Sequence, residues 1–159
     1  MRIRLVCVGK PRAGPLRAAA EEYAARLRPY AQVRWDWVEA EPLPVRPAPA
    51  EAERVRLREA QRLQQALQEG EYVVALDRTG PQLSSEELAD WLGRLLREGK
   101  SRTAWLVGGP LGLHEPLCRR ADARLSLSRL TFPHELVPVI LLEQLYRAFR
   151  ILRGEPYHY

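Results

Sequence analysis

Segments with strand patterning alternate with segments of helical patterning along this chain. Residues 2–9 are rich in apolar side chains, as in a buried strand, and residues 15–28 follow with apolar side chains at helical spacing. Such alternation predicts an α/β fold with a mainly parallel sheet of five or six strands and helices on both faces. The expected strands are 2–9, 32–40, 72–77, 103–109 and 123–128, and the expected helices are 15–28, 51–70, 84–99, 115–121 and 135–153.

The length and the spacing of these segments predict one domain over residues 1–159. Prolines at positions 42, 44, 47 and 49 make residues 41–51 a stiff loop between the second strand and the second helix. No run is long and apolar enough for a membrane span, and no signal peptide is recognisable at the N-terminus. We therefore expect a cytoplasmic protein with no membrane partner.

The net charge is +5, and all basic residues except Lys10 and Lys100 are arginine. Arginine suits the recognition of phosphate groups and nucleobases. Biased genome composition or heat adaptation explains the same excess about as well. The two cysteines, Cys7 and Cys118, show no metal-ligand spacing, so we expect free thiols and no metal.

The last predicted helix carries apolar side chains on more than one narrow stripe, whereas a surface helix needs an apolar face of only about 100°. The excess predicts a second partner that buries the helix. In a chain of this length, the natural partner is another copy, which predicts a homodimer.

The segment VGGPLG, residues 107–112, follows a predicted strand and matches neither of the glycine patterns that bind nucleotide phosphates. Pro110 removes one backbone hydrogen-bond donor, so the segment is expected to line a ligand site as one of its walls and not to bind an anion through its backbone N–H groups. Tight turns alone also explain such a glycine cluster. A second weakly charged loop, residues 125–135, ends another strand. Together the two loops predict a site for an adenosine-sized ligand at the carboxyl edge of the sheet.

LDRTG, LVGGPLGL, LSLSRLTFPHELV, LLEQLYRAFRI and the terminal EPYH occur in this order over nearly the whole chain. In this set the sequence resembles the RlmH family, small SPOUT-class methyltransferases that act on a pseudouridine of bacterial 23S rRNA. The resemblance implies a trefoil knot within about residues 72–159, an obligate homodimer and S-adenosylmethionine as the cofactor. It also implies methylation of N3 of the pseudouridine, on the assembled ribosome.

Carried over residue by residue, the family's cofactor loops fall on three segments that follow predicted strands. The implied cofactor-binding residues are Leu76, Gly108, Gly109, Leu127, Ser128, Arg129, Leu130, Thr131 and Phe132. A β-branched residue at Gly108 is expected to fill the cleft and block the cofactor without unfolding the protein.

The resemblance also implies catalytic roles for Glu143, Arg147, Tyr157 and His158. Tyr157 is expected to stack on the flipped base, and His158 to accept a proton from it or hydrogen-bond to it. Without the resemblance, Glu143 and Arg147 are equally well a surface ion pair four residues apart, and the chain end is expected to be disordered. His134 is as compatible with a loop or capping role as with a catalytic one.

Three positions depart from the family pattern. Leu111 replaces a usual glutamate, Pro138 replaces a common arginine, and Tyr159 stands where a basic residue usually follows the histidine. Two of these changes remove cations that the family has near RNA. Arg129, Arg150 and Arg153 are the candidates to compensate for this loss. The alternative hypothesis is a non-catalytic, ribosome-associated RNA-binding factor with the same fold.

Overall fold

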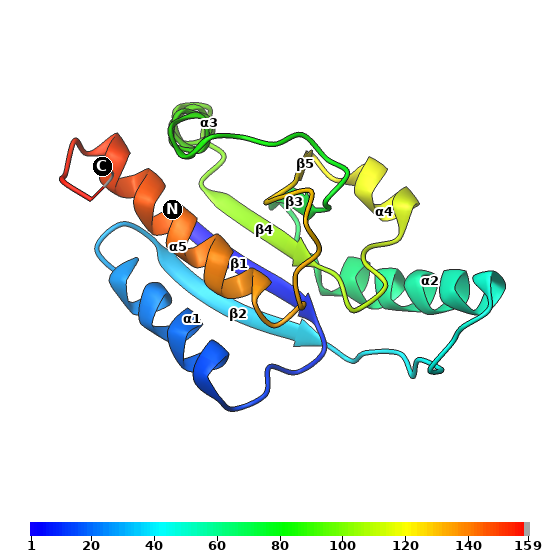
Figure 1. The fold of residues 1–159 in the computed structure, drawn as a ribbon. Helices are drawn as coiled ribbons and strands as arrows, with labels where there is room; N and C mark the ends of the chain where they lie inside the picture. The colour runs from blue at the N-terminus through cyan, green and yellow to red at the C-terminus, as the bar shows by residue number, and fades with distance from the viewer. Residues whose placement is uncertain (158–159) are drawn as a thin grey trace.

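The computed structural model describes residues 1–157 and shows a single sheet with helices on both faces (Figure 1). The five strands are all parallel, in the order β2-β1-β4-β3-β5. The strands are β1 (Arg2–Val8), β2 (Gln32–Val38), β3 (Tyr72–Leu76), β4 (Arg102–Val107) and β5 (Ala123–Leu125). The helices are α1 (Pro15–Arg26), α2 (Pro49–Ala66), α3 (Ser85–Arg97), α4 (Glu115–Arg120) and α5 (Val137–Leu152). The predicted α/β class and parallel sheet are confirmed.

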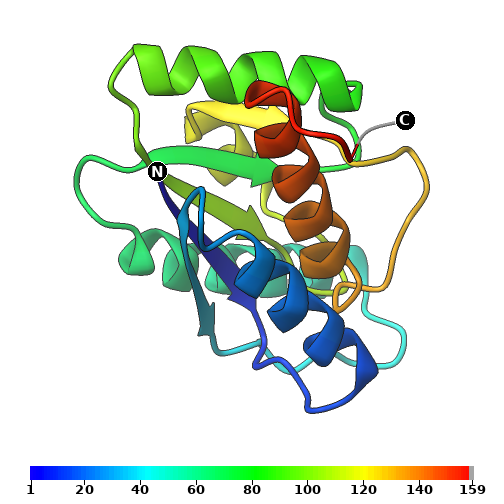
Figure 2. The same cartoon turned by 90° about the vertical axis from the view of Figure 1, so that its left-hand side faces the viewer.

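Alternating side chains of the central strands divide the core into two layers. Leu5 of β1 and Trp105 of β4 face α1, α3 and α5, whereas Val6 and Leu106 face α2 and α4. Figure 2 shows α1 and α5 on the viewer's side of the sheet and α2 behind it. The strands are apolar on both faces because helices cover both faces.

Local signals set most helix ends. Ser84 and Glu87 form the predicted capping box, in which the Glu87 N–H donates to Ser84 Oγ at 3.1 Å and the Ser84 N–H donates to Glu87 Oε2 at 2.7 Å. Helix α2 begins at Pro49, two residues before the predicted start, because proline is well tolerated in the first turn of a helix. The proline-rich loop therefore ends earlier than predicted.

The wide apolar surface of α5 is largely covered within the chain itself. This helix packs between α1 and α3 on the sheet, and Leu141, Leu142 and Leu145 are fully buried. The breadth of the apolar face therefore does not by itself require a second subunit, and the homodimer stays a prediction. Among the described residues no helix has the length and hydropathy of a membrane span.

Arg4, near the start of β1, forms a largely buried ion cluster with Glu71 and Asp36. Its Nε and Nη2 donate to the two carboxylate oxygens of Glu71, both at 2.7 Å, and its Nη1 donates to Asp36 Oδ2 at 3.0 Å. Burial raises the pKa of each carboxyl group and is the largest single effect. The hydrogen bonds and charge of Arg4, together with the Gln68 N–H at Glu71 and Arg34 at Asp36, outweigh it, so the pKa of both groups lies below the ordinary value.

We expect Glu71→Gln to lower the free energy of unfolding by about 3 kcal/mol at pH 7, because it leaves the buried Arg4 charge incompletely paired. The stabilisation from a carboxyl group with a lowered pKa is present above its unfolded pKa, about 4, and is lost as the pH falls through the folded value. The wild type should therefore lose more stability on acidification than the variant. Urea unfolding at neutral and acid pH measures both effects, with Glu98→Gln in an exposed ion pair as the matched control. Equal stability of Glu71→Gln and wild type at pH 7 would contradict the prediction.

Candidate active site

Loops that follow three strands enclose one cavity at the carboxyl edge of the sheet. Because all strands are parallel, the ends of β3, β4 and β5 meet at this edge (Figure 1). The cavity, here called the first cavity, has a volume of about 440 Å³. Its walls come from residues 76–78, 107–113 and 127–137.

Most of the residues expected to bind a cofactor line the first cavity: Leu76, Gly108, Gly109, Leu127, Ser128, Leu130, Thr131 and Phe132. Arg129 does not line it and is exposed. A tight turn explains this difference, because Ser128 Oγ accepts from the Leu130 N–H at 3.0 Å and the Ser128 carbonyl accepts from Ser126 Oγ at 2.9 Å. The turn leaves the Arg129 side chain outside the cavity.

The adjacent glycines Gly108 and Gly109, in the loop after β4, have different surroundings, and neither position points a Cβ atom into open space. A Cβ atom at Gly108 would lie 2.7 Å from the carbonyl carbon of Gly112 and 2.8 Å from the Leu113 nitrogen. The position is therefore closed by the returning backbone of its own loop, and the expectation that a side chain there would fill the open cleft is wrong. A Cβ atom at Gly109 would instead lie 3.2 Å from Glu59 Oε2 and from Val8 Cγ1, behind the loop.

Several other residues line the first cavity that the sequence analysis did not name individually as cofactor-binding, although five of them lie within the two loops that it predicted to form the site, residues 107–112 and 125–135. They are Asp77, Arg78, Val107, Pro110, Leu111, Gly112, Leu113, His134 and Val137. All lie within or directly beside the motifs that carried the family resemblance, so motif membership was the available signal. Leu111, one of the departures from the family pattern, lines the cavity with an apolar side chain.

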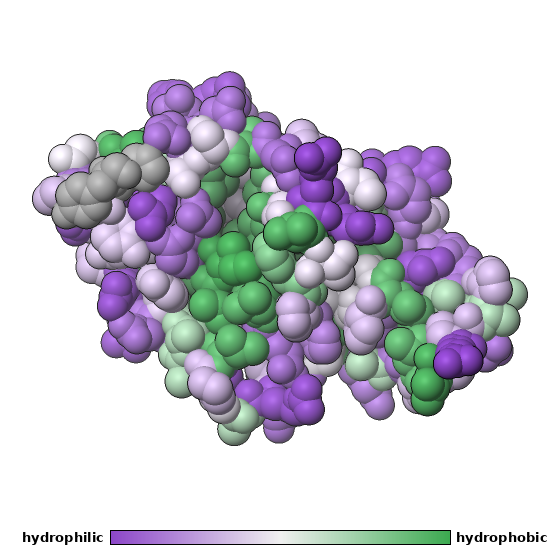
Figure 3. All heavy atoms as spheres, in the orientation of Figure 1, coloured by the Kyte–Doolittle hydropathy of each residue, from purple (hydrophilic) through white to green (hydrophobic). Residues whose placement is uncertain are grey.

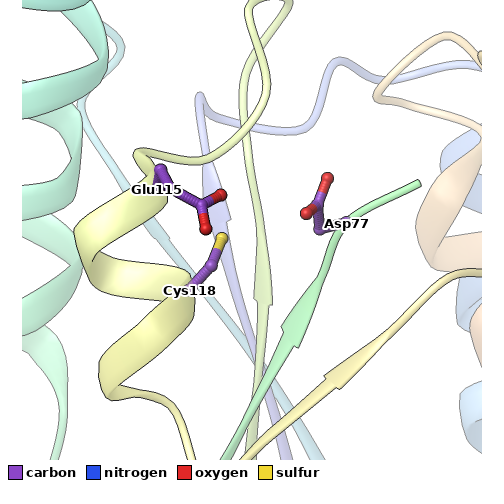
Figure 4. A group of neighbouring side chains, drawn as sticks. All are labelled: Asp77, Glu115 and Cys118. Atoms are coloured by element: carbon purple, nitrogen blue, oxygen red, sulfur yellow. The ribbon is translucent and has the colours of Figure 1, made fainter. Parts of the chain in front are cut away.

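Three potential metal ligands lie beside the first cavity. Figure 4 shows Glu115 and Cys118 of α4 facing Asp77 at the end of β3, and their ligand atoms lie within 4.8 Å of one another. Arg124 already pairs with both carboxylates, with Nη2 at 2.7 Å from Glu115 Oε1 and Nε at 3.6 Å from Asp77 Oδ2. Burial and the nearby Asp77 also raise the pKa of the Cys118 thiol, which disfavours the thiolate that a metal would need. The cluster is therefore explained as an ion pair with a buried thiol.

The catalytic residues implied by the resemblance form a second group, on α5 and the following tail. Glu143 Oε1 accepts from Arg147 Nη2 at 2.6 Å and from the Tyr157 hydroxyl at 3.2 Å. The Arg147 guanidinium lies 4.7 Å from the centre of the Tyr157 ring, and this ring packs edge-on against Tyr146. Burial, together with the Glu143 charge, raises the pKa of Tyr157 to about 12. Tyr157 is therefore protonated at neutral pH.

The two groups of predicted residues are not brought together within one chain. Glu143 lies six residues beyond Val137, which is about 9 Å along the axis of α5, and Tyr157 packs farther along the same helix. Neither Glu143, Arg147 nor Tyr157 is among the described residues that line the first cavity. His158 and Tyr159 lie outside the described residues.

The tail preceding Tyr157 is attached to α5 and to the turn between α1 and β2. Arg150 Nη1 pairs with Glu155 Oε2 at 2.7 Å, and its Nη2 donates to the Pro156 carbonyl at 2.9 Å. The Tyr30 hydroxyl also donates to Glu155. Up to Tyr157, the tail therefore lies along its own helix and does not close over its own first cavity.

Comparison with known proteins indicates one family over nearly the whole chain. Residues 1–158 match the family model described as "Predicted SPOUT methyltransferase". Three relatives bear the name "Ribosomal RNA large subunit methyltransferase H". The relative from Symbiobacterium thermophilum is 49% identical over 99% of this chain and 99% of its own length. Those from Pelotomaculum thermopropionicum and Moorella thermoacetica are each 48% identical over 99% of this chain, and over 98% and 99% of their own lengths.

Proposed function

Because this chain belongs to the SPOUT methyltransferase family, we propose that it methylates N3 of a pseudouridine in 23S rRNA, with S-adenosylmethionine as the methyl donor. The observation that carries this proposal is the first cavity, in which the three loops implied by the resemblance meet. Relatives with the rRNA methyltransferase name match almost end to end, which supports the same reaction for this chain.

The first cavity suits S-adenosylmethionine in size and chemistry. Its volume lies in the range of small-molecule sites, and apolar side chains and glycine backbone make up most of its walls. Leu76, Leu127 and Phe132 would hold the adenine by apolar contact, and the backbone at Gly108 and Gly109 would approach the ligand closely. When bound, the cofactor supplies an electrophilic methyl group on a sulfonium centre.

The proposed nucleophile is an imide nitrogen, so its proton must leave before or during methyl transfer. Tyr157, with a pKa of about 12, suits stacking and hydrogen-bond donation but cannot accept this proton at neutral pH. We propose Glu143 and Arg147 as residues that position the RNA, Tyr157 as the stacking residue and His158 as the proton acceptor. His134, which lines the first cavity, is the alternative acceptor.

Within one chain, Glu143, Arg147 and Tyr157 lie away from the first cavity. In a homodimer, these residues of one copy would lie next to the cofactor bound by the other copy. Figure 3 shows apolar residues gathered over the first turns of α5 and the adjoining loop. Leu130 is 71% exposed there, and Val137 and Ile140 are half-buried. We propose that a second copy covers this surface and presents its α5 and tail to the first cavity. We also propose a knotted segment within about residues 72–159 and action in the cytoplasm.

The proposal is tested with ribosomes from a strain that lacks the gene. Purified protein and S-adenosylmethionine should add one methyl group to one pseudouridine of 23S rRNA, detected by mass spectrometry of RNA digests. Assembled ribosomes are expected to be better substrates than separated subunits. An unchanged digest, together with no binding of S-adenosylmethionine at millimolar concentration in calorimetry, would favour the non-catalytic ribosome-associated factor instead.

A further inference from the structure

A second cavity of about 340 Å³ lies directly beside the first. It is formed mainly by residues 9–17, the loop between β1 and α1 with the first turn of that helix, and by Trp35 of β2. Val107 and His134 line both cavities, so the wall between the two spaces is one residue thick at these positions. A ligand in the second cavity would therefore lie next to a ligand in the first.

The floor of the second cavity is suited to a flat, weakly polar ring. Cys7, Trp35, Val107 and Pro138 supply apolar surface. The Trp35 indole N–H is buried next to the Cys7 thiol, so the indole presents mainly its apolar surface to the cavity.

The rim of the second cavity is basic. Lys10, Arg12 and Arg17 line it, with Glu135 as the acidic lining residue. Arg12 pairs with Glu135 at 2.7 Å and Arg17 pairs with Glu21 at 2.9 Å. The Lys10 ammonium lies 5.8 Å from the centre of the Trp37 ring, and within residues 1–157 it forms no ion pair with a carboxylate. Helix α1, whose start contributes to the rim, has no acidic residue in its first turn. The rim therefore favours an anionic group, such as a phosphate.

We propose that the second cavity receives the target nucleotide of the RNA, with its base on the apolar floor beside His134 and its phosphate at Lys10. This inference rests on the proposed methyltransferase function and adds the place where the nucleotide binds. The shared wall at Val107 and His134 would put the base next to the methyl donor, which in-line transfer requires.

Two variants test the second cavity in the full-length protein. Ala13 lines it and is exposed, so Ala13→Trp is expected to obstruct the cavity without disturbing the core. We expect single-turnover methyl transfer to ribosomes to fall about 100-fold, with the affinity for S-adenosylmethionine within about twofold of wild type. Lys10→Ala is expected to raise the KM for ribosomes severalfold at an unchanged cofactor affinity. Ala50→Trp and Arg54→Ala, at exposed positions on α2, are the matched controls and should behave as wild type.

A direct binding measurement separates this inference from the proposed function. Uridine 5′-monophosphate at millimolar concentration should shift the Trp35 indole N–H resonance of the protein bound to S-adenosylhomocysteine, with the resonance assigned from Trp35→Phe. Lys10→Ala should weaken the response. Absence of this shift, or full methyl transfer by Ala13→Trp, would overturn the nucleotide site. Failure of the wild type to methylate ribosomes would instead refute the proposed function, while the nucleotide titration still decides the inference.

Discussion

Gly108→Ala is expected to lower the affinity for S-adenosylmethionine at least about tenfold, or about 1.4 kcal/mol, and to reduce methyl transfer accordingly. The added Cβ atom would lie 2.7 Å from the Gly112 carbonyl carbon, and backbone atoms there cannot turn away as a side chain can. The loop must therefore open, and the wall of the first cavity moves with it. Isothermal titration calorimetry measures the affinity.

Two further glycines make this experiment specific. Gly109→Ala should have a smaller effect, because the new Cβ atom would meet side-chain atoms of Glu59 and Val8 at 3.2 Å. Gly99→Ala, at the end of α3, lies in a left-handed conformation with φ of 76°, so it should lower stability while leaving cofactor affinity unchanged. Wild-type affinity in Gly108→Ala would show that the loop after β4 does not form the cofactor site.

A chain that ends at Pro156 is expected to bind S-adenosylmethionine normally but to transfer the methyl group at least about 100-fold more slowly. The shortened chain keeps Glu155, whose contacts with Tyr30 and Arg150 attach the tail to the fold. It loses Tyr157 and the two residues that follow. Single-turnover transfer to ribosomes, beside calorimetry of cofactor binding, separates the chemical step from binding.

Tyr157→Phe serves as the matched control for the truncated chain. It keeps the ring between Tyr146 and Arg147 but loses the hydrogen bond to Glu143 at 3.2 Å. We expect it to retain most of the activity, because the proposed role of Tyr157 is stacking. Full activity of the truncated chain would remove the tail from the mechanism.

The element order, and the edge of the sheet at which the first cavity lies, were readable from local sequence patterns. Strands buried on both faces and amphipathic helices have distinct periodicities, and the carboxyl edge of a parallel sheet is where ligands bind. The family resemblance grouped Leu76, Gly108 and the segment from Leu127 to Phe132, and most of these residues line the first cavity. Arg129 is the exception, because a turn built on the Ser128 hydroxyl and carbonyl decides which side chains face inward.

Sequence alone therefore determined the α/β class, the parallel sheet and the segments that meet at its edge, because each depends on patterns within short stretches. Only the tertiary structure decided that Gly108 is closed by its own loop, that α5 is covered by α1 and α3, and that Glu143 and Tyr157 lie away from the first cavity. It also revealed the second cavity, which joins residues 9–17 to His134. These features depend on contacts between residues far apart in the chain, which no local periodicity encodes.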